Sequence, residues 1–92
     1  MSELLKQLRN QIDSIDDELL RLVNQRARLA QEIGRIKNHD IIYRPEREAQ
    51  ILARMQKQNA GPIGNAHIKG LFTEIMSICR ALEKPVTVAY LG

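Results

Sequence analysis

The chain has 92 residues, of which 43% are hydrophobic and 27% charged, a composition typical of one small globular domain rather than of a disordered segment. Aromatic residues make up only 3%, so it lacks the stacking platform of a single-strand nucleic-acid binder. One cysteine excludes an internal disulfide framework and fits a reducing compartment. We find no signal peptide and no apolar run near the roughly 20 residues that span a bilayer. The sequence therefore predicts a cytoplasmic protein, and the net charge of +3 suits a small anionic ligand or weak nucleic-acid contact.

Residues 4–37 are predicted to form one long helix, because they contain no proline and only one glycine. Aliphatic residues recur in alternating steps of three and four, as in a heptad seam, at Leu5, Leu8, Ile12, Ile15, Leu19, Leu22, Leu29, Ile33 and Ile36. Such a helix is roughly 50 Å long. A compact chain of this length is only about 30 Å across, so the helix must overhang its own domain. We therefore expect an obligate homodimer that covers the stripe. A coiled-coil linker would need more heptads and no compact remainder.

The rest of the domain is predicted to be helical as well. A second helix begins at Pro45, which suits a first helical position, and runs to about Gln58 with Ile51, Leu52 and Met55 on one face. Residues 59–64 form a loop by their turn residues, and a third helix runs from about Asn65 to before Pro85. Its apolar stripe is Ile68, Leu71, Phe72, Ile75, Cys79 and Leu82. The predicted fold is all-α, with helices of about 34, 14 and 19 residues.

The tail after Pro85 has a different character. Residues 86–92 are β-branched and aromatic, a pattern typical of a strand. They are either a frayed terminus or, as we favour, the first strand of a further domain.

Charged residues on the apolar stripes of the helices carry the chemical signal. Arg26 occupies the seam position between Leu22 and Leu29, and a buried guanidinium needs an anion, either a ligand or an ion-pair partner. Lys37 lies about 16 Å further along nearly the same face, so both cations could approach one anion. Arg9 is roughly 25 Å from Arg26 on another face. Only a partner's Arg9, in an antiparallel dimer, could reach the same ligand.

The second and third helices each place a carboxylate on an apolar face. Glu48 lies four residues before Leu52 with Arg44 and Arg47 beside it, and Glu83 lies four residues after Cys79. Alternatively, Glu48 is simply stabilised by the helix dipole, and Glu83 is a solvated residue of the last turn.

Other chemistries find no support. His39, His67 and Cys79 lack zinc-ligand spacing, and neither a nucleophile elbow nor a phosphate-binding glycine loop is present. Cys79 is predicted to be a small core residue rather than a nucleophile. The basic residues are spread over all three helices, which weakens a nucleic-acid interpretation.

Several segments together resemble the all-helical class of chorismate mutase over residues 4–84. They are Leu8-Arg9, Ile12-Asp13-Ser14-Ile15-Asp16, Arg26-Ala27-Arg28-Leu29-Ala30, Ile33-Gly34, Lys37 and Tyr43-Arg44-Pro45-Glu46-Arg47-Glu48. Residues 88–92 resemble the opening strand of prephenate dehydratase. The resemblance implies a mutase domain at residues 1–84, with residues 85–92 as a linker and the start of a truncated dehydratase domain. The parent would be a bifunctional enzyme, isomerase and lyase, of phenylalanine and tyrosine biosynthesis.

In this family two chains interlace through their first helices into a six-helix bundle with two equivalent sites. The resemblance implies that each site takes Arg9 from one chain and every other residue from the other. Chorismate, a dianion, rearranges there to prephenate in a pericyclic step that needs no cofactor, metal or nucleophile. The enzyme holds the reactive conformer and stabilises the charge that builds on the ether oxygen.

The resemblance also assigns roles. The partner's Arg9 and Arg26 would clamp the two carboxylates, and Lys37 would donate to the ether oxygen. Glu48 would accept from the substrate hydroxyl with Arg47 holding it in place. The ring-packing walls would be Ile33, Leu52 and Ile78.

Three positions depart from the family pattern. Arg44 stands where an aspartate contacts the substrate through its backbone, so only that main-chain role is transferred. Cys79 replaces a serine, and a thiol is a weaker donor. Glu83 replaces a glutamine that is the second donor to the ether oxygen, so it must be protonated to act. Burial beside an anionic substrate raises a carboxyl pKa. We therefore expect activity to decline as pH rises.

Two other functions remain open. An isochorismate pyruvate-lyase on the same scaffold would use a similar clamp. Release of pyruvate would distinguish this lyase from a chorismate mutase. A helical dimerisation or nucleic-acid-binding module would show steep salt dependence of DNA binding and no chorismate turnover.

Overall fold

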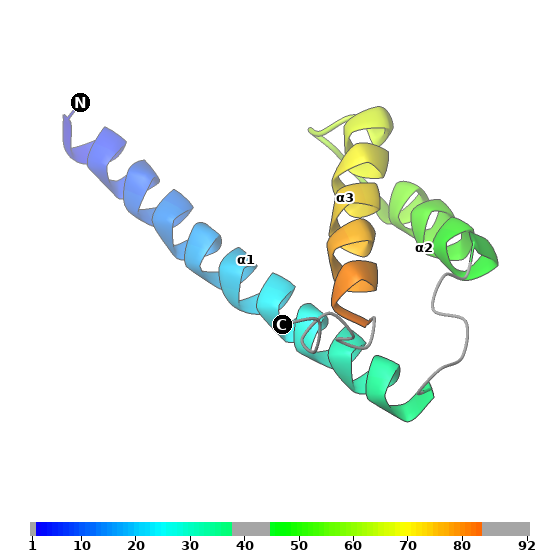
Figure 1. The fold of residues 1–92 in the computed structure, drawn as a ribbon. Helices are drawn as coiled ribbons and strands as arrows, with labels where there is room; N and C mark the ends of the chain where they lie inside the picture. Colours follow the sequence, from blue (N-terminus) through cyan, green and yellow to red (C-terminus); the bar gives the residue numbers. More distant parts are fainter. Residues whose placement is uncertain (1, 38–44, 84–92) are drawn as a thin grey trace.

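The computed structural model describes residues 2–37 and 45–83 and contains three helices in these ranges: α1 (Ser2–Lys37), α2 (Pro45–Gln58) and α3 (Asn65–Glu83) (Figure 1). The described part of the chain has no strand, which confirms the all-α prediction. The helix bounds agree with the predicted ones except that α1 begins at Ser2, two residues earlier. Arg44 and the predicted strand at 86–92 lie outside the described residues.

The molecule is elongated because α1 is much longer than the other two helices. Its dimensions are 57 × 33 × 20 Å and its radius of gyration is 17.4 Å, against about 12 Å for a compact chain of this length. Figure 1 shows the first turns of α1 extending away from α2 and α3, while the last turns of α3 approach its C-terminal part. We call residues 2–22 the outer half of α1 and residues 23–37 its inner half.

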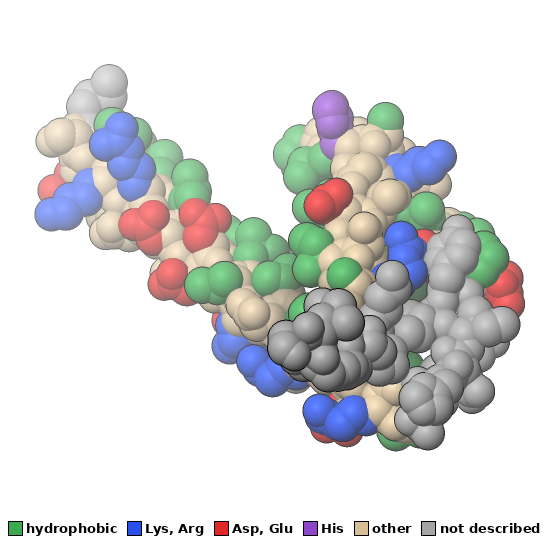
Figure 2. Space-filling view, in the orientation of Figure 1, with side chains coloured by type: hydrophobic (Ala, Val, Ile, Leu, Met, Phe, Trp, Pro, Cys, Tyr) green, Lys and Arg blue, Asp and Glu red, His purple; other side chains and the backbone are tan. Residues whose placement is uncertain are grey.

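The outer half leaves its apolar stripe uncovered by the described chain. Five side chains of the seam are between 47% and 58% exposed: Leu5, Leu8, Ile12, Ile15 and Leu19. Figure 2 shows hydrophobic side chains along the edge of α1 that faces α3, and others on the facing edge of α3. The predicted overhang is therefore confirmed, and the exposed stripe is far more than scattered surface leucines.

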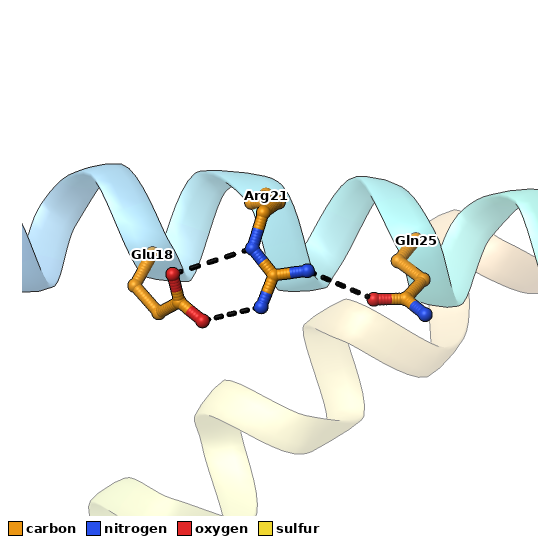
Figure 3. Close-up of polar contacts among 3 residues, drawn as sticks. All are labelled: Glu18, Arg21 and Gln25. Atoms are coloured by element: carbon orange, nitrogen blue, oxygen red, sulfur yellow. Dashed lines mark hydrogen bonds and ion pairs between the residues drawn. The ribbon is translucent and has the colours of Figure 1, made fainter.

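The other faces of α1 carry local ion pairs between residues three apart. Arg21 pairs with Glu18 three residues before it and donates to the side-chain oxygen of Gln25 at 3.3 Å (Figure 3). The hydrogen bond from Arg21 and its charge lower the pKa of the Glu18 carboxyl. Both side chains are 56% exposed, so the pair adds little stability.

The small core lies where α3 packs against α2 and the inner half of α1. Its buried hydrophobic residues are Ala30, Ile51, Met76 and Cys79. The predicted stripe of α3 contains Cys79 but misses Met76, and it includes Leu71 and Leu82, which are 51% and 41% exposed. The face of α3 that packs within the chain is therefore rotated from the stripe that periodicity predicts.

Gly34 allows the backbones of α1 and α3 to approach closely. It is buried, and a methyl group there would lie 3.0 Å from the Cα and carbonyl carbon of Glu83 and would overlap its carbonyl oxygen. Backbone atoms cannot move aside as a flexible side chain can. Only glycine therefore permits α3 to end against α1 at this point.

Asn59 fixes the loop between α2 and α3. Its side-chain nitrogen donates to the carbonyl oxygen of Ile63 at 2.7 Å and to the side-chain oxygen of Asn65 at 2.8 Å. Its side-chain oxygen accepts from the backbone nitrogen of Gly61, which has a φ of 83°, a conformation that favours glycine. The predicted loop at 59–64 is thereby confirmed and holds α2 and α3 side by side. None of the helices in the described ranges is both long enough and apolar enough to cross a membrane.

Candidate active site

A cavity of about 470 Å³ lies where the inner half of α1, the start of α2 and the end of α3 meet. Its charged lining residues come from all three helices and are Arg26, Arg47, Glu48, Arg80 and Glu83. Its apolar lining residues are Leu29, Ala30, Ile33, Ile51, Met76 and Cys79. A mostly apolar cavity with convergent charges is the usual form of a small-molecule site.

The cavity brings together most of the predicted site residues. Five of them line it: Arg26, Arg47, Glu48, Cys79 and Glu83. Residues that lie far apart in the sequence, from Arg26 to Glu83, thus meet around one space, because α3 packs against both other helices. Their individual roles toward a ligand stay predictions.

The other three predicted residues are not placed in the cavity of this chain. Arg9 is exposed on the outer half of α1, and seventeen residues of helix separate it from Arg26 by about 25 Å. Lys37 is the last residue of α1, and its side chain, like Arg44, lies outside what the structure describes. Arg9 can therefore reach such a cavity only in another copy of the chain.

The predicted apolar walls are partly displaced. Ile33 lines the cavity, but Leu52 and Ile78 do not, and Ile51 and Met76 lie there instead. Ile78 is 52% exposed in the single chain. The spacing of apolar residues indicates which of them share a face of a helix. It does not indicate how far that helix is rotated toward its neighbours.

Glu48 has an unpredicted partner, Arg80 of α3. The two side chains form an ion pair across the cavity wall and are only 25% and 31% exposed, respectively. The family resemblance implies that Glu48 is held by Arg47, the preceding residue, which lines the same cavity. A signal for Arg80 was present: it lies four residues after Met76 and three before Glu83, so all three share a face of α3.

Cys79 is buried, with 4% exposure, as predicted for a small core residue. No group of three or more His, Cys, Asp or Glu side chains within residues 2–37 and 45–83 could hold a metal ion.

Comparison with known proteins gives one family. The family model described as chorismate mutase type II matches residues 8–84. The chain is 50% identical over 92 residues to the bifunctional chorismate mutase/prephenate dehydratase of Neisseria gonorrhoeae, a match that covers all of this chain and 25% of that protein. The chain thus spans about a quarter of the length of the bifunctional relatives it matches.

Solved structures of chorismate mutases share the fold. A chorismate mutase of Thermus thermophilus superposes with a TM-score of 0.82 at 38% identity, covering 86% of this chain and 92% of that one. A chorismate mutase of Helicobacter pylori in complex with prephenate gives a TM-score of 0.81 at 34% identity, covering 88% and 90%.

Proposed function

Because the chain belongs to the chorismate mutase type II family, we propose that it catalyses the rearrangement of chorismate to prephenate in the cavity between its three helices. The observation that carries the proposal is the meeting of Arg26, Arg47, Glu48 and Glu83 around one partly apolar space. The Helicobacter pylori relative of the same fold binds prephenate, the product of this reaction.

The cavity fits one ring-shaped dianion. The apolar residues offer surfaces for the ring, and the guanidinium groups offer forked donors that match carboxylates. Binding energy from these contacts would hold chorismate in the compact conformer from which the rearrangement proceeds. No group needs to exchange a proton or form a covalent bond with the substrate. The protein's contribution is orientation together with charge complementarity.

The charged groups that line the cavity leave little positive charge for this substrate. Three arginines and two carboxylates line the cavity, which leaves one positive charge while both carboxylates are ionised and two when Glu83 is protonated, for a ligand with two negative charges. Lys37 at the end of α1 would supply a further positive charge and would donate to the ether oxygen. The partner's Arg9 would supply another and would complete the clamp that Arg26 begins.

The homodimer that brings in the partner's Arg9 rests on the exposed stripe of α1. A seam of five aliphatic side chains about half exposed would be costly to leave in water, at about 25 cal/mol for each Å². A second copy carries the same stripe and can cover it by two-fold symmetry. We propose that two chains interlock through α1 into a six-helix bundle with two equivalent sites.

Glu83 would be the second donor to the ether oxygen, in its protonated form. It lies at the end of α3, on the cavity wall, where two substrate carboxylates disfavour a further negative charge. As pH rises and Glu83 loses its proton, the donor is lost and the rearrangement slows. The buried Cys79 thiol one turn earlier would assist a substrate carboxylate as a weak donor.

The residues after the mutase domain point to a second activity in the parent protein. The mutase family model stops at residue 84, whereas the match to the Neisseria gonorrhoeae relative runs over all 92 residues. We propose that residues 85–92 lead into a prephenate dehydratase domain. The native protein, captured from its own cells with an antibody against this domain, should then also convert prephenate to phenylpyruvate; mutase activity alone would contradict this part.

The direct test follows chorismate loss, prephenate formation and pyruvate release with the purified chain. The proposal predicts one prephenate for each chorismate consumed, without pyruvate. Stoichiometric pyruvate would identify a lyase instead. The absence of turnover at concentrations where the chain is dimeric would contradict the proposed function.

A further inference from the structure

Among the charged residues that line the cavity, Glu48 of α2 and Arg80 of α3 form an ion pair between the two helices. Arg80 donates through one terminal guanidinium nitrogen to Oε2 of Glu48, 32 residues away in sequence. Both side chains are about one-quarter to one-third exposed, against 56% for the Glu18–Arg21 pair on α1. The contact with Arg80 is therefore less screened by water than an ordinary surface pair.

The position of Arg80 suits it to orient the Glu48 carboxylate. Arg47 precedes Glu48 on the same helix, and adjacent residues of a helix point about 100° apart. Arg80 instead comes from α3, the helix that also carries Cys79 and Glu83 into the cavity. Its bond to Oε2 ties the carboxylate to that helix. A carboxylate has two acceptor oxygens, so Glu48 can still accept a hydrogen bond from a donor group of the ligand.

Arg80 also changes the charge that a ligand meets. An ionised Glu48 alone would repel an anionic substrate, since its side chain is only 25% exposed and the repulsion would be poorly screened. A guanidinium bound to Glu48 offsets that charge and lets the carboxylate act as a directed acceptor. Without Arg80, Glu48 would be free to rotate away from the ligand.

We propose that Arg80 is a positioning residue that presents the Glu48 carboxylate to the hydroxyl group of the substrate. This inference rests on the proposed function, because it takes the hydroxyl group of chorismate as the donor of a hydrogen bond to Glu48. It adds a residue of α3 to the site and makes the orientation of Glu48 depend on the packing of α3 against α2.

A double-mutant cycle tests the proposal. Arg80→Met keeps the apolar stem and removes the charge, and Glu48→Gln removes the negative acceptor. If Arg80 acts through Glu48, Arg80→Met lowers kcat/KM by about tenfold in the wild type and by less than about twofold in the Glu48→Gln background. Arg54→Met, an exposed arginine of α2 outside the cavity lining, is the matched control and should leave both backgrounds unchanged.

The contradicting outcomes are distinct from a failure of the proposed function. If the wild type turns over chorismate and Arg80→Met has equal effects in both backgrounds, Arg80 acts independently of Glu48 and the inference is wrong. An unchanged kcat/KM in Arg80→Met overturns it as well. Should Arg80→Met fail to fold by circular dichroism, Arg80→Lys takes its place in the cycle. Lysine keeps the positive charge but lacks the planar guanidinium group. Arg80→Lys should therefore lower kcat/KM by less than Arg80→Met does, and this loss should again disappear in the Glu48→Gln background. A wild type without turnover refutes the proposed function itself.

Discussion

The two halves of α1 are built from the same heptad seam, yet they meet different surroundings. The inner half packs against α3, buries Ala30 and Gly34, and contributes Arg26 to the cavity. The aliphatic seam itself is exposed in both halves: five side chains of the outer half are 47–58% exposed, and Leu29, Ile33 and Ile36 of the inner half are 58%, 45% and 79% exposed. What distinguishes the inner half is a second face, at Ala30 and Gly34, which is buried. One continuous helix thus has two different parts. Its inner part lines a cavity within the chain, and we propose that its outer part offers an apolar surface and Arg9 to a second chain.

The largest expected effect comes from breaking the outer half. Ile12→Glu places a charge on the exposed stripe, roughly 20 Å from Arg26 along the helix. Each dimer would bury two such charges at a cost of several kcal/mol each. We expect a monomer by sedimentation and loss of chorismate turnover, although the cavity residues are unchanged.

Asn10→Glu is the control for that variant. It adds the same charge two residues earlier, on the opposite side of α1. This variant should stay dimeric and active. An active, monomeric Ile12→Glu protein would show that the outer half has no part in the site.

Arg26→Leu acts on the inner half and should remove activity without removing the fold. The lost contacts to a substrate carboxylate are charge-assisted, so we expect about three decades lower kcat/KM. Leucine completes the apolar seam, and thermal unfolding should show equal or greater stability. A strongly destabilised Arg26→Leu protein would mean that Arg26 serves an ion pair of the fold.

Gly34→Ala tests the close approach on which the inner half depends. A methyl group would push the end of α3, and Glu83 with it, away from α1. We expect kcat to fall by about tenfold or more, since small displacements of catalytic groups are costly. Gly70→Ala on α3 is the control. Nothing lies within 4 Å of a methyl group there, so it should stabilise α3 by up to about 1 kcal/mol and keep full activity. Equal activities of the two variants would refute the positional role of Gly34.

Glu83→Gln should have the smallest effect at low pH and should alter the shape of the pH profile. Wild-type kcat should decline as pH rises, because a deprotonated Glu83 cannot donate to the ether oxygen. Glutamine donates at every pH, so the variant profile should be flat over the same range. Identical profiles for both proteins would exclude Glu83 as the donor.

The sequence alone was enough to predict the three helices and several of the charged residues that line the cavity, for physical reasons. Periodicity and turn residues are local, and they placed the ends of α2 and α3 correctly. Arg26, Glu48 and Glu83 were conspicuous because a charge on an apolar stripe is costly. The partner of Glu48 and the close approach at Gly34 depend on how α3 crosses the other helices. The residue pattern along one helix does not reveal the angle at which that helix crosses its neighbours. The positions of Arg80 and Met76 in the cavity wall were therefore not predicted.

Subunit complementation tests directly whether two chains share each active site. Arg9→Ala and Arg26→Ala chains should each be nearly inactive alone. When the two are refolded together, about half of the dimers are mixed and each mixed dimer has one intact site of two, so about a quarter of wild-type activity should return. Native mass spectrometry would count the mixed dimers. If they form and the mixture is no more active than its two parents, Arg9 and Arg26 do not act on the same substrate from different chains.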